Sequence, residues 1–92
     1  MNKTDKIFVH DILESIVAIE KYTQDLTYQD FLHKKETQDA VLRRLQIVGE
    51  ASKKVFPETK KKFYDVPWQK MMGVRNMIVH QYFGVDLLNI IF

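Results

Sequence analysis

5-DKIFVHDILESIVAIEKYTQDL-26 is the stretch that decides the fold class, because its apolar side chains recur at steps of three and four residues. That spacing places them on one side of an α-helix. Thr4 is positioned to cap this helix, and Asp5 in the first turn suits the positive end of the helix dipole. The apolar stripe consists of Val9, Ile12, Leu13, Ile16 and Ile19, and the mostly polar stripe opposite it of Asp11, Glu14, Ala18, Lys21 and Asp25.

A second long helix is predicted over residues 37–55. Thr37 is positioned to cap it, and Pro57 ends it because the residue before a proline is disfavoured in the α conformation. Residues 27–36, which precede it, are interpreted as a connector with one or two helical turns. The side of the helix that we expect to be buried holds Val41, Leu45, Val48, Ser52 and Val55.

A third helix is predicted to start at Pro67 and to close at Gly84. Proline suits the first helical position, where its missing N–H is harmless. Residues 58–66 before it are interpreted as a basic connector, and the apolar end of the chain, residues 87–92, is expected to dock on the bundle or on a partner. The side expected to be buried holds Trp68, Met71, Met72, Ile78, Val79 and Tyr82.

Composition supports one all-α domain over residues 1–92, a helical bundle. Three glycines and two prolines leave little turn chemistry for a sandwich or barrel of short strands. The absence of cysteine excludes disulfides, thiolate catalysis and metal centres with cysteine ligands. No apolar run approaches the roughly 18 residues of a membrane span, and residues 1–8 have no signal-peptide core, so we expect a cytoplasmic protein that does not enter a membrane.

Charge is distributed unevenly along the chain. Residues 1–42 carry a net charge of −3 and residues 43–92 a net charge of +5, which together give the net charge of +2. The basic half includes the run Lys60-Lys61-Lys62. Such a run is most often a solvated face, although it also permits binding to a phosphate backbone.

Arg75 interrupts the apolar side of the third predicted helix. A guanidinium does not lose its proton to escape burial, so it needs paired acceptors or a cleft that admits an anion. One interpretation is a structural ion pair with an acid such as Glu50 or Asp11. The other is an anion-binding cleft, and periodicity alone favours the first.

Asn76 and His80 lie four residues apart and therefore stack on one flank of the same helix. Gly73 begins that flank and leaves space beside it, and Tyr82 returns to the side of Arg75. Taken singly, His80 is interpreted as a surface or half-buried histidine, and Tyr82 as a core aromatic residue with its hydroxyl at the rim. Their combination with a permanent cation on one helix points to a reactive site.

Alternative groups in the chain are weaker candidates. His10 and His33 are interpreted as solvated or partly buried histidines rather than as second catalytic groups. Neither the histidines nor the acids show a metal-ligand spacing that stands out, and the chain has no glycine-rich phosphate loop. No metal and no cofactor are therefore expected.

The segment from Arg75 to Tyr82 resembles the signature of the HEPN superfamily in its HepT-like toxin branch. The matching elements are Arg-Asn at 75–76, His80 and Tyr82. The resemblance extends from Asp5 to Asp86, and members of this branch usually continue further, so the last helix is expected to be shortened. Further matching segments are Thr37-Gln-Asp-Ala-Val, Ile47-Val-Gly-Glu-Ala, Val66-Pro-Trp and His80-Gln-Tyr-Phe-Gly-Val-Asp.

The resemblance implies a HEPN-type antiparallel helical bundle that forms a homodimer and cleaves RNA as a metal-independent endoribonuclease. Arg75 and His80 then match the catalytic pair. A twofold dimer would bring the pair of one subunit together with the same pair of the other subunit. Asn76 matches the supporting polar residue. Tyr82 matches a tyrosine that a minimal nucleotidyltransferase antitoxin modifies with AMP. The alternative is a non-catalytic helical module that dimerises and binds a nucleotidyltransferase partner or a nucleotide.

Overall fold

The chain is all-α in the part that the structure describes. The computed structural model describes the backbone of residues 1–80 and the side chains of residues 1–74. Within the backbone described, no helix is long and apolar enough to cross a membrane. The helices are α1 (Lys3–Thr23), α2 (Tyr28–Leu32), α3 (Lys35–Lys54), α4 (Pro57–Lys62) and α5 (Trp68–His80).

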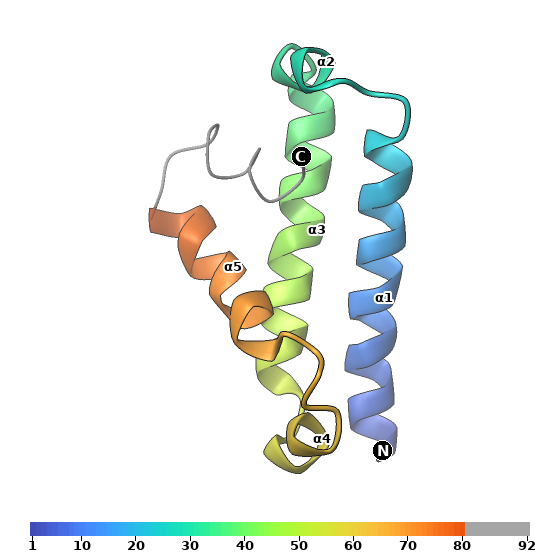
Figure 1. The fold of residues 1–92 in the computed structure, drawn as a ribbon, viewed down its shortest axis with the longest axis vertical. Coiled ribbons are helices and arrows are strands. Elements are labelled where there is room, and N and C mark those ends of the chain that lie inside the picture. Colours follow the sequence, from blue (N-terminus) through green and yellow to red (C-terminus); the bar gives the residue numbers. More distant parts are fainter. Residues whose placement is uncertain (81–92) are drawn as a thin grey trace.

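The helix α3 is the centre of the arrangement. It runs antiparallel to α1 on one side and packs against α5 on the other, and α5 leans away from it (Figure 1). The short helices α2 and α4 lie at opposite ends, and the N-terminus lies at the end of α4 (Figure 1). The expectation of an antiparallel helical bundle is confirmed for these elements.

Two apolar clusters make up the core. One contains Phe31, Val41 and Leu45, with Val74 of α5 packed against it. The other contains Ile12, Val48 and Ala51, with Phe8, Trp68 and Met71 packed against it. Side chains from α1, α3 and α5 therefore meet in the second cluster, which fixes the beginning of α5.

The inward side of α3 is the one that the sequence pattern predicts. Its members are all buried, and the Ser52 hydroxyl donates a hydrogen bond to the Val48 carbonyl at 2.6 Å. The cap prediction is wrong: the helix begins at Lys35, two residues before Thr37, and Lys34 at the cap position offers no side-chain hydrogen bond. The buried members are Val41, Leu45, Val48, Ser52 and Val55.

The inward side of α1 differs from the prediction. Leu13 and Ile16 are exposed, at 57% and 39% of their surface, while Asp5 and Ser15 are fully buried. The reason is that α1 is apolar on two sides, so hydrophobic periodicity does not decide which side faces α3. The cap prediction also fails, because α1 begins at Lys3 and Asn2 accepts the Asp5 N–H at 2.7 Å in place of Thr4.

Asp5 connects the start of α1 to the start of α4. One carboxylate oxygen accepts the backbone N–H of Phe56 at 3.1 Å, and the other accepts the hydroxyl of Thr59. Phe56 is the cap residue of α4, whose first N–H groups have no partner within the helix. A residue at the beginning of the chain therefore caps a helix more than fifty positions away.

The segment 58–66, expected to be a connector, contains the helix α4. Pro57 occupies the first turn, where its fixed backbone angle favours a helix, and Glu58 follows it. The lysine run forms the last turn, where positive charge suits the negative end of the helix dipole. The connector prediction is thus wrong for residues 58–62, which belong to α4, and right for the turn that follows.

The connector 27–36 contains one short helix, α2, as expected. Thr27 and Asp30 form a reciprocal capping box: each side chain accepts the backbone N–H of the other, both at 3.1 Å. The backbone N–H of Thr27 is the main reason why the pKa of the Asp30 carboxyl lies below its usual value, and the Thr27 hydroxyl, Lys34 and His33 act in the same direction.

We expect an NMR titration to find the pKa of Asp30 below that of an unfolded aspartate. A lowered pKa in the folded state means that the box contributes stability above the unfolded pKa and loses it as the pH falls through the folded pKa. Thr27→Val removes the hydroxyl and keeps the backbone N–H, so it should raise the pKa only part of the way. A pKa of Asp30 equal to or above that of an unfolded aspartate would contradict this expectation.

Candidate active site on α5

The residues that carry the expected chemistry lie on α5 or just beyond it. The backbone of α5 is described from Trp68 to His80, which includes positions 75, 76 and 80. The side chains of Arg75, Asn76 and His80 lie outside the described residues, as does Tyr82 altogether. The structure therefore confirms that Arg75, Asn76 and His80 share one helix and gives their register on it.

One flank of α5 is open. Gly73 is exposed, and a Cβ built on it would meet no atom within 4 Å in the described part of the structure. Gln69, four residues earlier, is exposed as well. Positions 76 and 80 follow Gly73 by three and seven residues, which is the same flank in helical register. The space that the sequence predicted beside Gly73 is confirmed.

The adjacent side of α5 packs on the bundle. Trp68 and Met71 contact the cluster around Ile12, and Val74 contacts the cluster around Phe31. Position 75 follows Trp68 by two helical turns, so its register is on the packed side. The helix thus places position 75 and position 80 about 140° apart around its axis at 3.6 residues per turn.

A pocket lies at the corner between α4 and α5. Its volume is about 490 Å³, and its walls come from the last turn of α4, the turn that follows and the first turn of α5. None of the residues that line it is acidic. The Trp68 indole N–H donates to the Phe63 carbonyl at 2.9 Å, which fixes the ring beside the turn. The pocket therefore adjoins the helix that carries the candidate residues.

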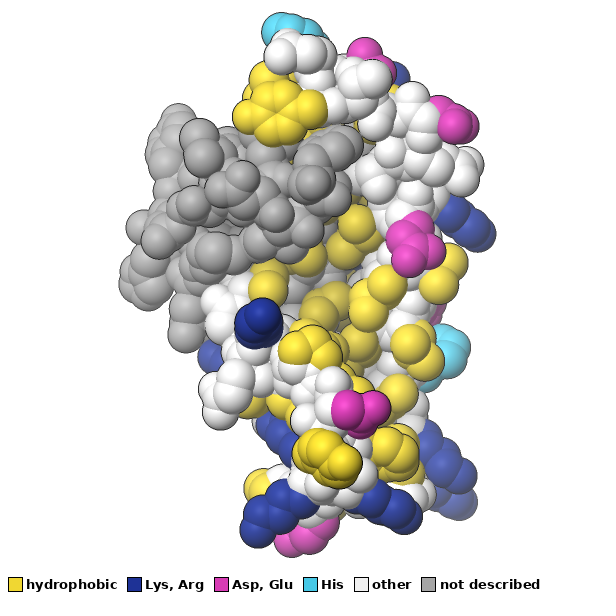
Figure 2. Space-filling view, in the orientation of Figure 1, with side chains coloured by type: hydrophobic (Ala, Val, Ile, Leu, Met, Phe, Trp, Pro, Cys, Tyr) yellow, Lys and Arg dark blue, Asp and Glu magenta, His cyan; other side chains and the backbone are white. Residues whose placement is uncertain are grey.

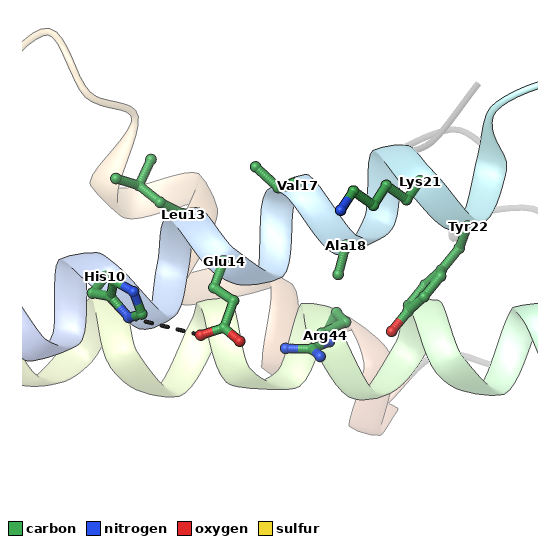
Figure 3. A pocket seen from close by; sticks show the side chains of 8 residues that line it. All are labelled: His10, Leu13, Glu14, Val17, Ala18, Lys21, Tyr22 and Arg44. Atoms are coloured by element: carbon green, nitrogen blue, oxygen red, sulfur yellow. Dashed lines mark ion pairs between the residues drawn. The ribbon is translucent and has the colours of Figure 1, made fainter.

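A second groove lies along the seam between α1 and α3. Its volume is about 460 Å³, and Figure 3 shows Tyr22 of α1 toward one end and Arg44 of α3 between Tyr22 and Glu14. At the other end the His10 imidazole lies 3.7 Å from the Glu14 carboxylate. The groove contains none of the predicted site residues.

The histidines expected to be solvated are exposed. His10 belongs to α1, and His33 ends α2. His10, Asp11 and Glu14 bring potential metal-ligand atoms within 4.8 Å of one another, and theirs is the one such cluster found in the described residues. An ordinary ion pair between positions four apart on an exposed helix face accounts for this proximity.

Comparison with known families decides the assignment of the chain. The sequence model described as "HepT-like: Ribonuclease HepT-like" matches residues 12–91. The chain belongs to the HepT-like ribonuclease family. The resemblance expected from Arg75, His80 and Tyr82 is thereby confirmed at the level of the family.

The HepT-like chain is also similar to curated proteins of archaea. It is 43% identical to "Putative RNase MJ1380" of Methanocaldococcus jannaschii over 96% of this chain and 82% of that protein. It is 41% identical to "Probable ribonuclease HepT" of Thermococcus cleftensis over 95% of this chain and 79% of that protein. A third relative, "Gamma-glutamylcyclotransferase and putative RNase MJ0434" of M. jannaschii, is 46% identical over 95% of this chain and 39% of its own length. No solved structure matches the chain significantly.

Sequence reasoning missed the pocket between α4 and α5 of this HepT-like chain. The charge pattern predicts a connector for the lysine run and assigns no role to Tyr64. The signal is present in the sequence, since the aromatic residues at 63, 64 and 68 lie between lysines at 60–62 and a lysine at 70. What the sequence did not show is that Pro57 starts a helix, which turns the lysines and the aromatic residues toward one corner.

Proposed function

We propose that this protein is a metal-independent endoribonuclease whose site combines Arg75 and His80 from both subunits of a homodimer. Membership of the HepT-like ribonuclease family is the observation that carries the proposal. The names of the relatives, which refer to RNase activity, support it. The register of α5 is compatible with it, because position 80 shares the open flank of Gly73.

The chemistry requires few protein groups. RNA supplies its own nucleophile, the 2′-hydroxyl, which attacks the adjacent phosphorus and expels the 5′-oxygen of the next nucleotide. A histidine titrates near neutral pH and serves as the base or the acid, and an arginine binds the phosphate with two parallel hydrogen bonds and stabilises its growing charge. Two subunits would supply one histidine for each proton transfer. Asn76 is assigned to support of the phosphate or of the histidine.

The outer face of α1 offers an apolar surface for contact with another protein. Leu13, Ile16 and Val17 are exposed there at 57%, 39% and 48% of their surface. Hydrophobic side chains gather over α1 and the adjoining part of the bundle on the face drawn in Figure 2. A contiguous apolar face of this kind is typical of an interface between proteins.

Regulation is the second part of the proposal. We assign Tyr82 as the residue that a minimal nucleotidyltransferase antitoxin modifies with AMP in a cytoplasmic toxin–antitoxin pair. Adenylylation would add a bulky anion to the tyrosine seven positions after Arg75 in the sequence, and this group would occupy the phosphate site or neutralise the cation. A Tyr82→Phe variant would then retain cleavage and escape inhibition.

The experiment is incubation of the purified full chain with mixed RNA in EDTA. We expect fragments that end in 2′,3′-cyclic phosphate, because the 2′-hydroxyl is the nucleophile and no metal is required. Gel filtration with light scattering should give twice the monomer mass. Intact RNA after incubation, together with tight binding of a nucleotidyltransferase, would instead favour the non-catalytic module, and cleavage that stops in EDTA would refute metal independence.

A further inference from the structure

The corner between α4 and α5 combines a positive rim with aromatic walls. Lys60, Lys61 and Lys70 line the pocket together with Tyr64 and Trp68. No acid is among the residues that line it, and none of the three lysines forms an ion pair within the described residues. Lys and Arg side chains gather at the end of the molecule where α4 lies (Figure 2).

Tyr64 is the most exposed of the large hydrophobic residues that the structure describes. Its surface is 85% exposed, although its backbone belongs to a well-anchored turn. The Phe63 carbonyl accepts the Val66 N–H at 3.1 Å and the Trp68 indole N–H at 2.9 Å. The phenol ring is therefore presented to solvent from a turn that is fixed at both ends.

The lysines and the two aromatic rings share one pocket wall. The Lys60 ammonium lies 3.3 Å from the Met72 sulfur of α5, so its aliphatic stem follows the protein surface and its charge stays at the corner. Trp68 is half-buried, with one part packed on the core and another part lining the pocket. Flat apolar rings bordered by cations are the combination that binds single-stranded nucleic acid through base stacking and phosphate contacts.

We propose that this pocket binds an unpaired nucleotide of the RNA substrate, beside the cleavage site. Tyr64 provides the stacking surface for the base, and Lys61 and Lys70 contact the flanking phosphates. Position 75 lies two helical turns beyond Trp68, roughly 10 Å along the axis at 1.5 Å per residue. A strand held at the corner therefore reaches the candidate catalytic residues within a few nucleotides.

This inference rests on the proposed ribonuclease function for its substrate, and it adds a requirement for single-stranded RNA. A base in a duplex is already stacked and is not available to Tyr64. The pocket would thus select loops, ends and other unpaired segments. Stacking on an aromatic ring does not distinguish one base from another. The pocket therefore holds the strand in place and does not select a nucleotide sequence.

The test is fluorescence anisotropy with the wild-type chain and a short labelled 2′-O-methyl oligoribonucleotide, which lacks the nucleophile and is not cleaved. Tyr64→Ala should raise the Kd roughly tenfold, because one stacked base is lost. Tyr64→Phe should bind within about twofold of wild type, since the ring is retained. Tyr22→Ala, which removes a tyrosine from the groove between α1 and α3, serves as the matched control and should leave the Kd unchanged.

The charge contribution is measured by salt dependence. The logarithm of the association constant falls as the logarithm of the salt concentration rises. Lys61→Gln combined with Lys70→Gln should make this slope less steep by about 1.4, at about 0.7 per phosphate contact. Lys21→Gln combined with Lys34→Gln makes the same change of charge outside the corner and should leave the slope unchanged. An equal effect of both double variants, or an unchanged Kd in Tyr64→Ala, overturns the inference.

Cleavage kinetics separate this inference from the proposed function. With cleavable RNA, Tyr64→Ala should raise KM and leave kcat near wild type, and Tyr64→Phe should restore KM, because stacking outside the reacting bond contributes equally to ground state and transition state. Cleavage that depends on His80 but not on Tyr64 refutes the pocket alone. Binding that depends on Tyr64 without any cleavage refutes the ribonuclease and leaves the pocket standing.

Discussion

His80→Ala should lower the rate of RNA cleavage by roughly 10²- to 10⁴-fold, the range that a general acid or base contributes. Arg75→Ala should cause a loss of roughly 10²- to 10³-fold, because the charge that develops on the phosphate then lacks its cation. Both rates are measured as single-turnover cleavage of a labelled RNA in EDTA. Helix content and dimer mass should stay near those of the wild-type chain.

Matched variants make this expectation specific. His33→Ala removes an exposed histidine at the end of α2, and Arg43→Ala removes an exposed arginine of α3. Both should retain cleavage within about threefold, since surface changes of this kind seldom affect stability by more than about 0.5 kcal/mol. Full cleavage by both His80→Ala and Arg75→Ala would remove the catalytic assignment, whatever the outcome at the pocket beside α4.

Asp5→Ala should produce the largest loss of stability among single substitutions in α1. It removes two hydrogen bonds to a fully buried carboxylate and leaves the Phe56 N–H and the Thr59 hydroxyl without a partner. We expect the free energy of unfolding to fall by about 3 kcal/mol. For a domain of this size that corresponds to a decrease in Tm of roughly 10–20 °C.

The control is Asp11→Ala, which removes the same type of residue from a half-exposed position of the same helix. Its effect should stay within about 0.5 kcal/mol. A double-mutant cycle of Asp5→Ala with Thr59→Val should show strong coupling, because both changes remove the same hydrogen bond. If Asp5→Ala and Asp11→Ala lower the free energy of unfolding in urea by the same amount, the connection between α1 and α4 does not contribute to the stability of the fold.

Periodicity predicted the inner side of α3 correctly because that helix is apolar on one side only. Each residue that the pattern places on the inward side, from Val41 to Val55, is buried. The same reasoning failed for α1, which carries apolar residues on two sides and buries Asp5 and Ser15 instead of Leu13 and Ile16. A buried carboxylate is explained by partners 51 and 54 positions away, which no local pattern contains.

The candidate site shows the same division between local and long-range information. The spacing from Arg75 to His80 is local, so the sequence placed both residues on one helix, and the backbone of α5 agrees. The pocket beside α4 depends on a helix that starts at Pro57 and on a turn held by Trp68. Neither is visible in the charge pattern, which shows only a run of lysines.

The connection from Asp5 to α4 also affects how loss-of-function variants of this chain should be interpreted. The turn after α4 leads directly into α5, so loosening the start of α4 disturbs the helix that carries Arg75, seventy positions away from Asp5. A screen of random substitutions scored by activity alone would therefore group Asp5 with the residues that touch RNA. The amount of soluble protein in each clone would separate the two, because catalytic variants accumulate normally whereas Asp5 variants are degraded.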